Sequence, residues 1–190
     1  SGQRLFNFDV PGQATWQPGG FFADGRRMLF LSMEPRRDGP GKPFAEYYHK
    51  TLTRLWSYDF ENESLTEIAT RDRLAVFYTP QLLLNGERIL MQVVRDEGAQ
   101  VFNMKLDGTD AREFTRLGEG VPYGFDLSPD GRRVAYHLAS PSGYQIWTSD
   151  AEGGNRTLAA STPDHLYFCP QWSPDGQWLA FQDCLYQQDP

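Results

Sequence analysis

The stretch WSPDGQWLAF, residues 172–181, decides the fold of this chain, because the chain repeats it. Earlier copies read FDLSPDGRRVAY at 125–136, LLLNGERIL at 82–90 and FFADGRRMLF at 21–30. In each copy Asp or Asn precedes a glycine, and this pair supplies the positive φ angles that a tight hairpin turn needs. Apolar residues flank the pair on both sides. Each copy therefore predicts two antiparallel strands joined by a short turn.

The spacing of these turns predicts the architecture. Gly86, Gly131 and Gly176 are separated by 45 residues, twice over, which is the period of a four-stranded propeller blade. A second pair of alternating apolar and polar runs follows each of the first three turns, at 53–60 and 65–69, 100–106 and 111–115, and 145–150 and 156–159. We predict an all-β fold, a β-propeller of four-stranded antiparallel blades with about three and a half blades in this chain.

The domain organisation follows from that count. We expect a single, partial propeller domain over 1–190, made of an N-terminal strand within 1–15 that could close a ring, blade one at 16–70 with an insertion at 33–51, blade two at 75–118, blade three at 121–160 and the first half of blade four at 165–190. Closed propellers have at least about four blades. We therefore expect either the N-terminal part of a longer protein or two chains that complete one ring. Open blade edges would favour a homodimer.

Charge and composition exclude several classes of partner. The net charge is −7, and the 18 basic residues are scattered instead of forming a patch, so we expect no nucleic-acid partner. No apolar run is long enough to span a membrane. The chain also lacks a phosphate-binding glycine loop and a serine-hydrolase nucleophile motif. Its two cysteines, Cys169 and Cys184, flank the last hairpin, and we expect free, largely buried thiols.

Propeller geometry divides the candidate residues between two faces. The Asp-Gly turns lie on one face, where their aspartates serve turn geometry. The segments that lead into each blade, and the loops between second and third strands, lie on the other. The longest of these loops is the insertion 33–51, since the first two turn glycines are 61 residues apart. Long loops on a rigid scaffold often carry function.

Acidic, aromatic, imidazole and guanidinium side chains gather on this second face. The candidates for catalysis are His49, Arg54 and His165, and the candidates for ligand binding are Glu46, Tyr47, Tyr48, Tyr78, Tyr123, His137 and Tyr167. Aromatic faces with a few charged groups suit sugars or peptides. The alternative for the aromatics is packing between blades, and for His137 an ordinary polar role. No close pair of His or Cys residues has metal-ligand spacing, so we predict no metal ligands.

The units SPDGRRVAY at 128–136 and LDGTDAREFT at 106–115 resemble the repeats of TolB-type β-propellers. This resemblance implies a bacterial, exported protein, periplasmic in many cases. It also implies a binding module, which here would take a protein or saccharide ligand on the face of the insertion.

A narrower resemblance links residues 44–49 and 53–59 to the oligogalacturonate lyases. It implies an alternative function as a carbohydrate-active enzyme that cleaves uronides by β-elimination with a divalent metal. In that reaction a base removes the proton next to a carboxylate, and a cation stabilises the product anion. Those enzymes carry histidine ligands where this chain has Gly124 and Cys169. We therefore expect no cofactor unless the lyase alternative holds.

Overall fold

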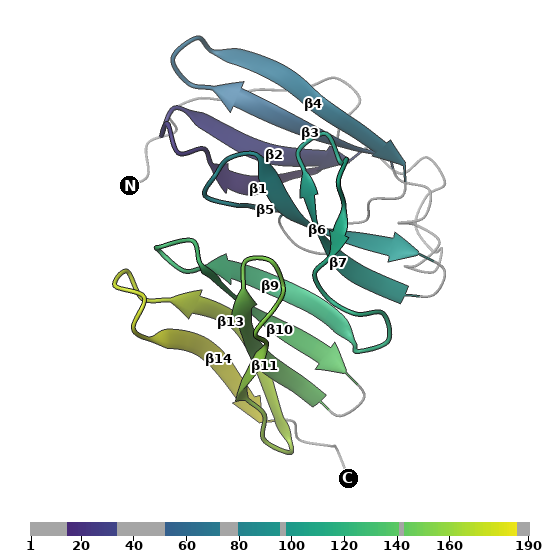
Figure 1. Cartoon of the computed structure of the whole chain (residues 1–190), viewed down its shortest axis with the longest axis vertical. Helices are drawn as coiled ribbons and strands as arrows, with labels where there is room; N and C mark the ends of the chain where they lie inside the picture. The colour runs from purple at the N-terminus through teal and green to yellow at the C-terminus, as the bar shows by residue number, and fades with distance from the viewer. Residues whose placement is uncertain (1–14, 34–51, 73–79, 96–97, 141–142, 186–190) are drawn as a thin grey trace.

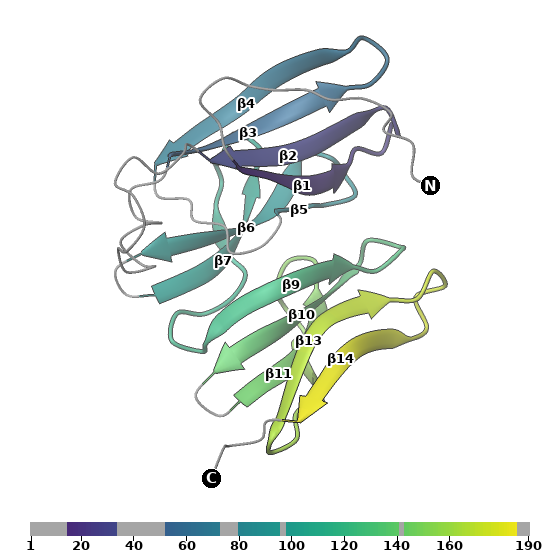
Figure 2. The same cartoon turned by 180° about the vertical axis from the view of Figure 1, so that it is seen from behind.

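The computed structural model describes residues 15–33, 52–72, 80–95, 98–140 and 143–185. All the regular elements in these ranges are β-strands, and they form successive antiparallel sheets. The first three follow one another along the long axis of the molecule, and the last lies beside the third (Figures 1 and 2). The prediction of an all-β fold built from four-stranded antiparallel blades is confirmed.

Each sheet is a run of strands consecutive in sequence. The first contains β1 (Thr15–Phe21), β2 (Arg27–Met33), β3 (Leu52–Asp59) and β4 (Ser64–Asp72). The second contains β5 (Gln81–Leu82), β6 (Arg88–Arg95), β7 (Gly98–Lys105) and β8 (Arg112–Glu113). The third contains β9 (Val121–Leu127), β10 (Arg133–Ser140), β11 (Gly143–Asp150) and β12 (Thr157–Ala160). The last pairs β13 (His165–Trp172) with β14 (Leu179–Leu185).

The repeated turns share one geometry. Their glycines have φ angles of 64°, 67°, 69° and 69°, at Gly25, Gly86, Gly131 and Gly176 respectively. Each glycine N–H donates to the carbonyl three residues earlier, at 2.8 or 2.9 Å. The residue before each glycine uses its side-chain oxygen to accept a hydrogen bond from the backbone N–H two positions later in the chain. These residues are Asp24, Asn85, Asp130 and Asp175. These side chains hold the turn, which is the structural role expected of them.

Successive sheets pack through buried apolar side chains that alternate along each strand. In β6, Ile89 and Met91 belong to the cluster shared with Leu29 of the first sheet, whereas Leu90 packs with Tyr136 of the third. All five side chains are at most 1% exposed. A strand sends successive side chains to opposite faces, so the middle sheet contributes to two interfaces. This double burial explains why β6 is apolar almost throughout.

On the turn face, each hairpin turn also touches the next one. Phe22 lies against Gly86, Leu84 against Gly131, and Pro129 against Gly176. A Cβ atom added at Gly131 would lie 2.3 Å from Leu84 Cδ1. The positive φ favours glycine there, and a larger residue would also displace the exposed side chain of Leu84. The turn face is occupied by contacts between blades.

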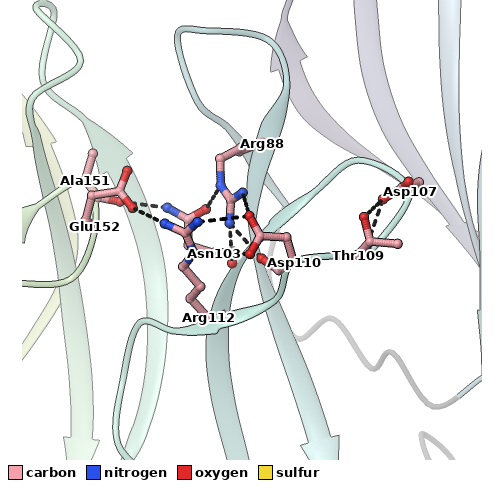
Figure 3. A network of polar contacts seen from close by, with 8 residues as sticks. All are labelled: Arg88, Asn103, Asp107, Thr109, Asp110, Arg112, Ala151 and Glu152. Carbon is pink, nitrogen blue, oxygen red and sulfur yellow. Dashed lines mark hydrogen bonds and ion pairs between the residues drawn. The ribbon is translucent and has the colours of Figure 1, made fainter.

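A polar network ties the second sheet to the third on this same face (Figure 3). Arg88 donates to the side chain and carbonyl of Asn103 and to Asp110, with a distance of 2.7 Å between Arg88 Nη1 and Asp110 Oδ2. Asn103 Nδ2 then donates to the carbonyl of Ala151 in the third sheet, at 3.1 Å. The Arg88 side chain is only 12% exposed and Asn103 is buried, so this part of the network is shielded from water, whereas the Asp110 side chain is 40% exposed.

The last hairpin differs from the others in its exposure. Trp178 is 75% exposed and Leu185 is 67% exposed, because no further strand covers β14 in the described part of the chain. Cys169 and Cys184 are free, as predicted, but both are exposed. The prediction of buried thiols was therefore wrong. No helix in the described ranges is long and apolar enough to cross a membrane.

Candidate functional site

The strands β2, β6 and β10 all end at the same edge of the sheets, on the left in Figure 2. We call this edge the insertion face. Five of the predicted site residues lie outside the described residues, namely Glu46, Tyr47, Tyr48, His49 and Tyr78. The insertion 33–51 lies outside them as well, apart from Met33, which ends β2. The site is therefore built below from the remaining parts of the chain.

His137 lies in an aromatic cage between the third and fourth sheets. The ring of Tyr123, its partner on the paired strand, lies tilted against it, with 5.1 Å between ring centroids. The rings of Tyr144 and Phe168 lie 6.3 and 5.6 Å from the imidazole. His137 is 1% exposed, and this burial lowers the pKa of its imidazole from 6.5 to about 4. The structure places His137 and Tyr123 in inter-sheet packing, the alternative considered for the aromatics.

His165 and Tyr167 come together at the start of β13. His165 Nδ1 lies 2.6 Å from Asp183 Oδ1 on the paired strand, and its ring stacks on Tyr167 with a centroid distance of 5.8 Å. Tyr167 itself is 6% exposed and contacts the ring of Phe181 edge-on. The carboxylate thus orients an imidazole that remains partly open to solvent.

Arg54 belongs to a different part of the molecule. It lies in β3 of the first sheet, and Figure 1 shows this strand and β13 at opposite ends of the structure. Its guanidinium lies 3.2 Å from both carboxylate oxygens of Glu67. Among the described residues, the fold does not bring Arg54 and His165 into one site.

The metal implied by the lyase resemblance can be tested against the residues present. Gly124 and Cys169 do adjoin His137, because a Cβ atom at Gly124 would lie 2.9 Å from His137 Nδ1 and 3.7 Å from the Cα atom of Cys169. Gly124 has no side chain to donate, and His137 is enclosed by aromatic rings. No group of three or more His, Cys, Asp or Glu side chains in the described ranges could hold a metal ion. These residues do not fit a divalent metal.

The sequence did not predict the pocket that opens between the third sheet and the segment that joins β8 to β9. It has a volume of about 580 Å³ and is lined by Arg116, Glu119, Leu138, Ser140, Gln145, Trp147 and Arg156. Leu138 and Ser140 lie near the end of β10 and Gln145 near the start of β11, so this end of the pocket reaches the insertion face. Arg156 lies at its other end, just before β12. The outer strand β8 has two residues, against nine in β4. We attribute the pocket to this short strand, which leaves the outer part of the third sheet uncovered.

One wall of the pocket is a fixed ion pair. Arg156 Nη1 lies 2.7 and 2.6 Å from the two carboxylate oxygens of Glu119, and Arg156 Nε donates to Tyr136 Oη at 2.9 Å. The guanidinium carbon lies 5.2 Å from the ring centroid of Trp147. Because each partner holds the guanidinium in a different direction, this wall is preorganised.

The remaining lining combines an aromatic surface with a cation, Arg116, that is unpaired among the residues the structure describes. Trp147 Nε1 donates to Gln145 Oε1 at 2.9 Å, and Gln145 Nε2 donates to Ser161 Oγ at 3.3 Å. Arg116 is exposed. Its backbone N–H donates to Glu119 at 3.3 Å, whereas its guanidinium has no hydrogen-bond or ion-pair partner among the described residues.

One sequence signal marked this place. Trp147 faces Tyr136 across the third sheet, just as Trp56 faces Phe30 in the first and Phe102 faces Met91 in the second. Trp56 and Phe102 are 9% and 7% exposed, whereas Trp147 is half-buried. An aromatic side chain at this repeated position was readable from the sequence, but its exposure was not.

Comparison with known proteins places the fold. No family model matches the chain. Over 49 residues, 26% of this chain and 11% of the relative, the sequence is 35% identical to the Tol-Pal system protein TolB of Albidiferax ferrireducens. The structure resembles TolB from Acinetobacter baumannii, with a TM-score of 0.62 and 15% identity, over 87% of this chain and 36% of that one. It also resembles an oligogalacturonate lyase from Vibrio parahaemolyticus, with a TM-score of 0.62 and 19% identity, over 86% and 46% of the two chains.

These likenesses confirm the predicted resemblance of the repeats to TolB-type propellers, with a weaker one to the lyases. The chain spans about a third of the length of the TolB structure that it matches. At these identities the structural likeness establishes the fold and leaves the ligand to be inferred from the site.

Proposed function

We propose that this chain, which has the fold of a TolB-type β-propeller, is part of a binding module that takes a protein or saccharide ligand on the insertion face. The observation that carries this proposal is the pocket of about 580 Å³ between the third sheet and the segment that joins β8 to β9. Ligand sites are typically concave, mostly apolar and equipped with a few fixed polar groups. The pocket has these properties, with Trp147 in its lining and the Arg156–Glu119 pair as a rigid wall.

The turn face supports the same conclusion by elimination. Its carboxylates are engaged by their own turns: the hydroxyl of Ser128 lowers the pKa of Asp130, and that of Ser173 lowers the pKa of Asp175. Each carboxylate also accepts a backbone hydrogen bond. Carboxylates held ionised in this way serve structure rather than proton transfer. The carboxylates of these turns are therefore already occupied within the turns.

A ligand screen tests the proposal. The labelled 190-residue chain would be applied to an array of immobilised oligosaccharides and to a displayed peptide library. We expect the bound ligand to be lost with Trp147→Ala and retained with Trp178→Ser, a matched change of an exposed tryptophan beside a turn. Binding that depends on Trp178 and tolerates Trp147→Ala would place the ligand on the turn face and refute the proposal.

We also propose that the natural protein is exported, in the periplasm of a bacterial cell. The support is the resemblance of the repeats to TolB, over the short matched segment as well as in fold. Fractionation of cells that express the natural gene would test it. Recovery of the protein only with cytoplasmic markers would contradict it.

The alternative function is that of a uronide lyase, and one observation favours it. His165 is held 2.6 Å from Asp183, and an imidazole oriented by a carboxylate is suited to act as a general base. The assay is the absorbance of unsaturated uronates after incubation with oligogalacturonides. Activity that disappears with His165→Gln would support the lyase function, and no activity in the unaltered chain would reject it for these residues.

A further inference from the structure

We infer that the pocket between the third sheet and the segment that joins β8 to β9 takes an apolar side chain lying next to a carboxylate, in a peptide segment of a partner protein. This inference rests on the proposed function and names the ligand of that same site. It follows from two properties of the lining, namely how many of its polar groups are already hydrogen-bonded and which charge remains unpaired.

Most polar groups of the lining are already bonded to each other or to the backbone. The Trp147 indole N–H is used by Gln145, whose amide N–H donates to Ser161. Ser140 Oγ donates to the carbonyl of Gly143 at 3.1 Å. The Glu119 carboxylate is occupied by Arg156. The pocket therefore offers few free hydrogen-bonding groups to a ligand.

The small number of free hydrogen-bonding groups in the pocket favours an apolar ligand group over a sugar. A sugar carries hydroxyls on most of its carbons, and each hydroxyl that loses water without gaining a partner costs free energy. An apolar side chain has no such groups to satisfy. It would bury its surface against Trp147 and Leu138, the large apolar side chains of the lining.

The charge at the rim selects a carboxylate. Arg156 is neutralised by Glu119 at 2.6 Å, whereas the guanidinium of Arg116 has no ionic partner in the part of the chain described. The three charged side chains of the lining thus leave one positive charge, in a chain whose net charge is −7. A planar guanidinium with free N–H groups pairs well with a carboxylate.

Nuclear magnetic resonance of the 15N-labelled chain tests the inference. The probe is N-acetyl-leucyl-phenylalanine with a free carboxylate, compared with its C-terminal amide and with maltotriose. The readout is the indole N–H signal of Trp147, one of five tryptophans, identified by its loss in Trp147→Phe. We expect the acid to shift this signal at about millimolar concentration and to bind about fivefold more tightly than the amide, as for an exposed ion pair.

Two variants separate the charge from the fold. Arg116→Gln should remove the preference for the acid and leave the affinity for the amide unchanged. Arg132→Gln, an exposed arginine on the turn face, should change neither. Equal binding of acid and amide to the unaltered chain, or no shift of the Trp147 signal by either, would overturn the inference. A shift by maltotriose alone would also overturn it, while leaving the binding module of the proposed function standing.

Discussion

The buried imidazole of His137 gives this fold a stability that depends on pH. Its pKa is lowered from 6.5 to about 4 by burial among Tyr123, Tyr144 and Phe168. Between these two values the unfolded chain binds a proton that the folded chain does not. The contribution of His137 to the free energy of unfolding is therefore fully present above about pH 6.5 and is lost as the pH falls toward 4.

The size of the loss follows from the two pKa values. Linkage with 6.5 for the unfolded state and about 4 for the folded state gives a loss of about 2 kcal/mol between about pH 7.5 and pH 5. It reaches a limit of roughly 3.4 kcal/mol below pH 4, at 1.36 kcal/mol for each unit of pKa.

Urea unfolding followed by tryptophan fluorescence measures this loss. The chain and His137→Leu would be unfolded at several values between about pH 5 and 7.5. We expect the free energy of unfolding of the unaltered chain to fall by about 2 kcal/mol more than that of the variant over this range. His165→Gln, a change of a partly exposed histidine, should follow the unaltered chain. Parallel pH profiles for the chain and His137→Leu would refute the reasoning.

Three further predictions concern the scaffold and its open edge. Gly120→Ala should destabilise the fold by more than about 2 kcal/mol, since the new Cβ would lie 2.4 Å from the Ala139 carbonyl oxygen at a φ of 135°. Thermal unfolding would measure this loss. The control Gly143→Ala, at a φ of 114° but with open space around the new Cβ, should cost clearly less. Arg88→Met should cost about 2–3 kcal/mol, because it leaves the side-chain oxygen of the buried Asn103 unsatisfied. Arg112→Met, 61% exposed, should cost under about 0.5 kcal/mol; equal losses in chemical unfolding would contradict the network's role. The exposed strand β14 should make the chain dimerise as its concentration rises. Light scattering should show a monomer for Leu185→Lys on β14 and a dimer for Leu158→Lys on β12. A monomeric unaltered chain would refute this prediction.

The candidate site was less accessible to prediction than the fold. The histidines and aromatics were identified by residue type and by the face on which their strands end. For His165 the structure agrees with the expected face, since this residue lies at the start of β13, beside Asp183. It could not distinguish a side chain at the surface from one between sheets, and His137 is the second kind.

The sequence by itself determined the repeat, the hairpins and the fold class. These depend on local properties: Asp-Gly pairs set the turns at φ angles near 64–69°, and alternation along each strand sets its two faces. The tertiary structure alone decided the pocket, which joins Arg116, Trp147 and Arg156 from separate segments, and the exposure of Cys169 and Cys184. Burial depends on which sheet packs against a side chain, and that packing is set by residues distant in sequence, such as those of the short strand β8.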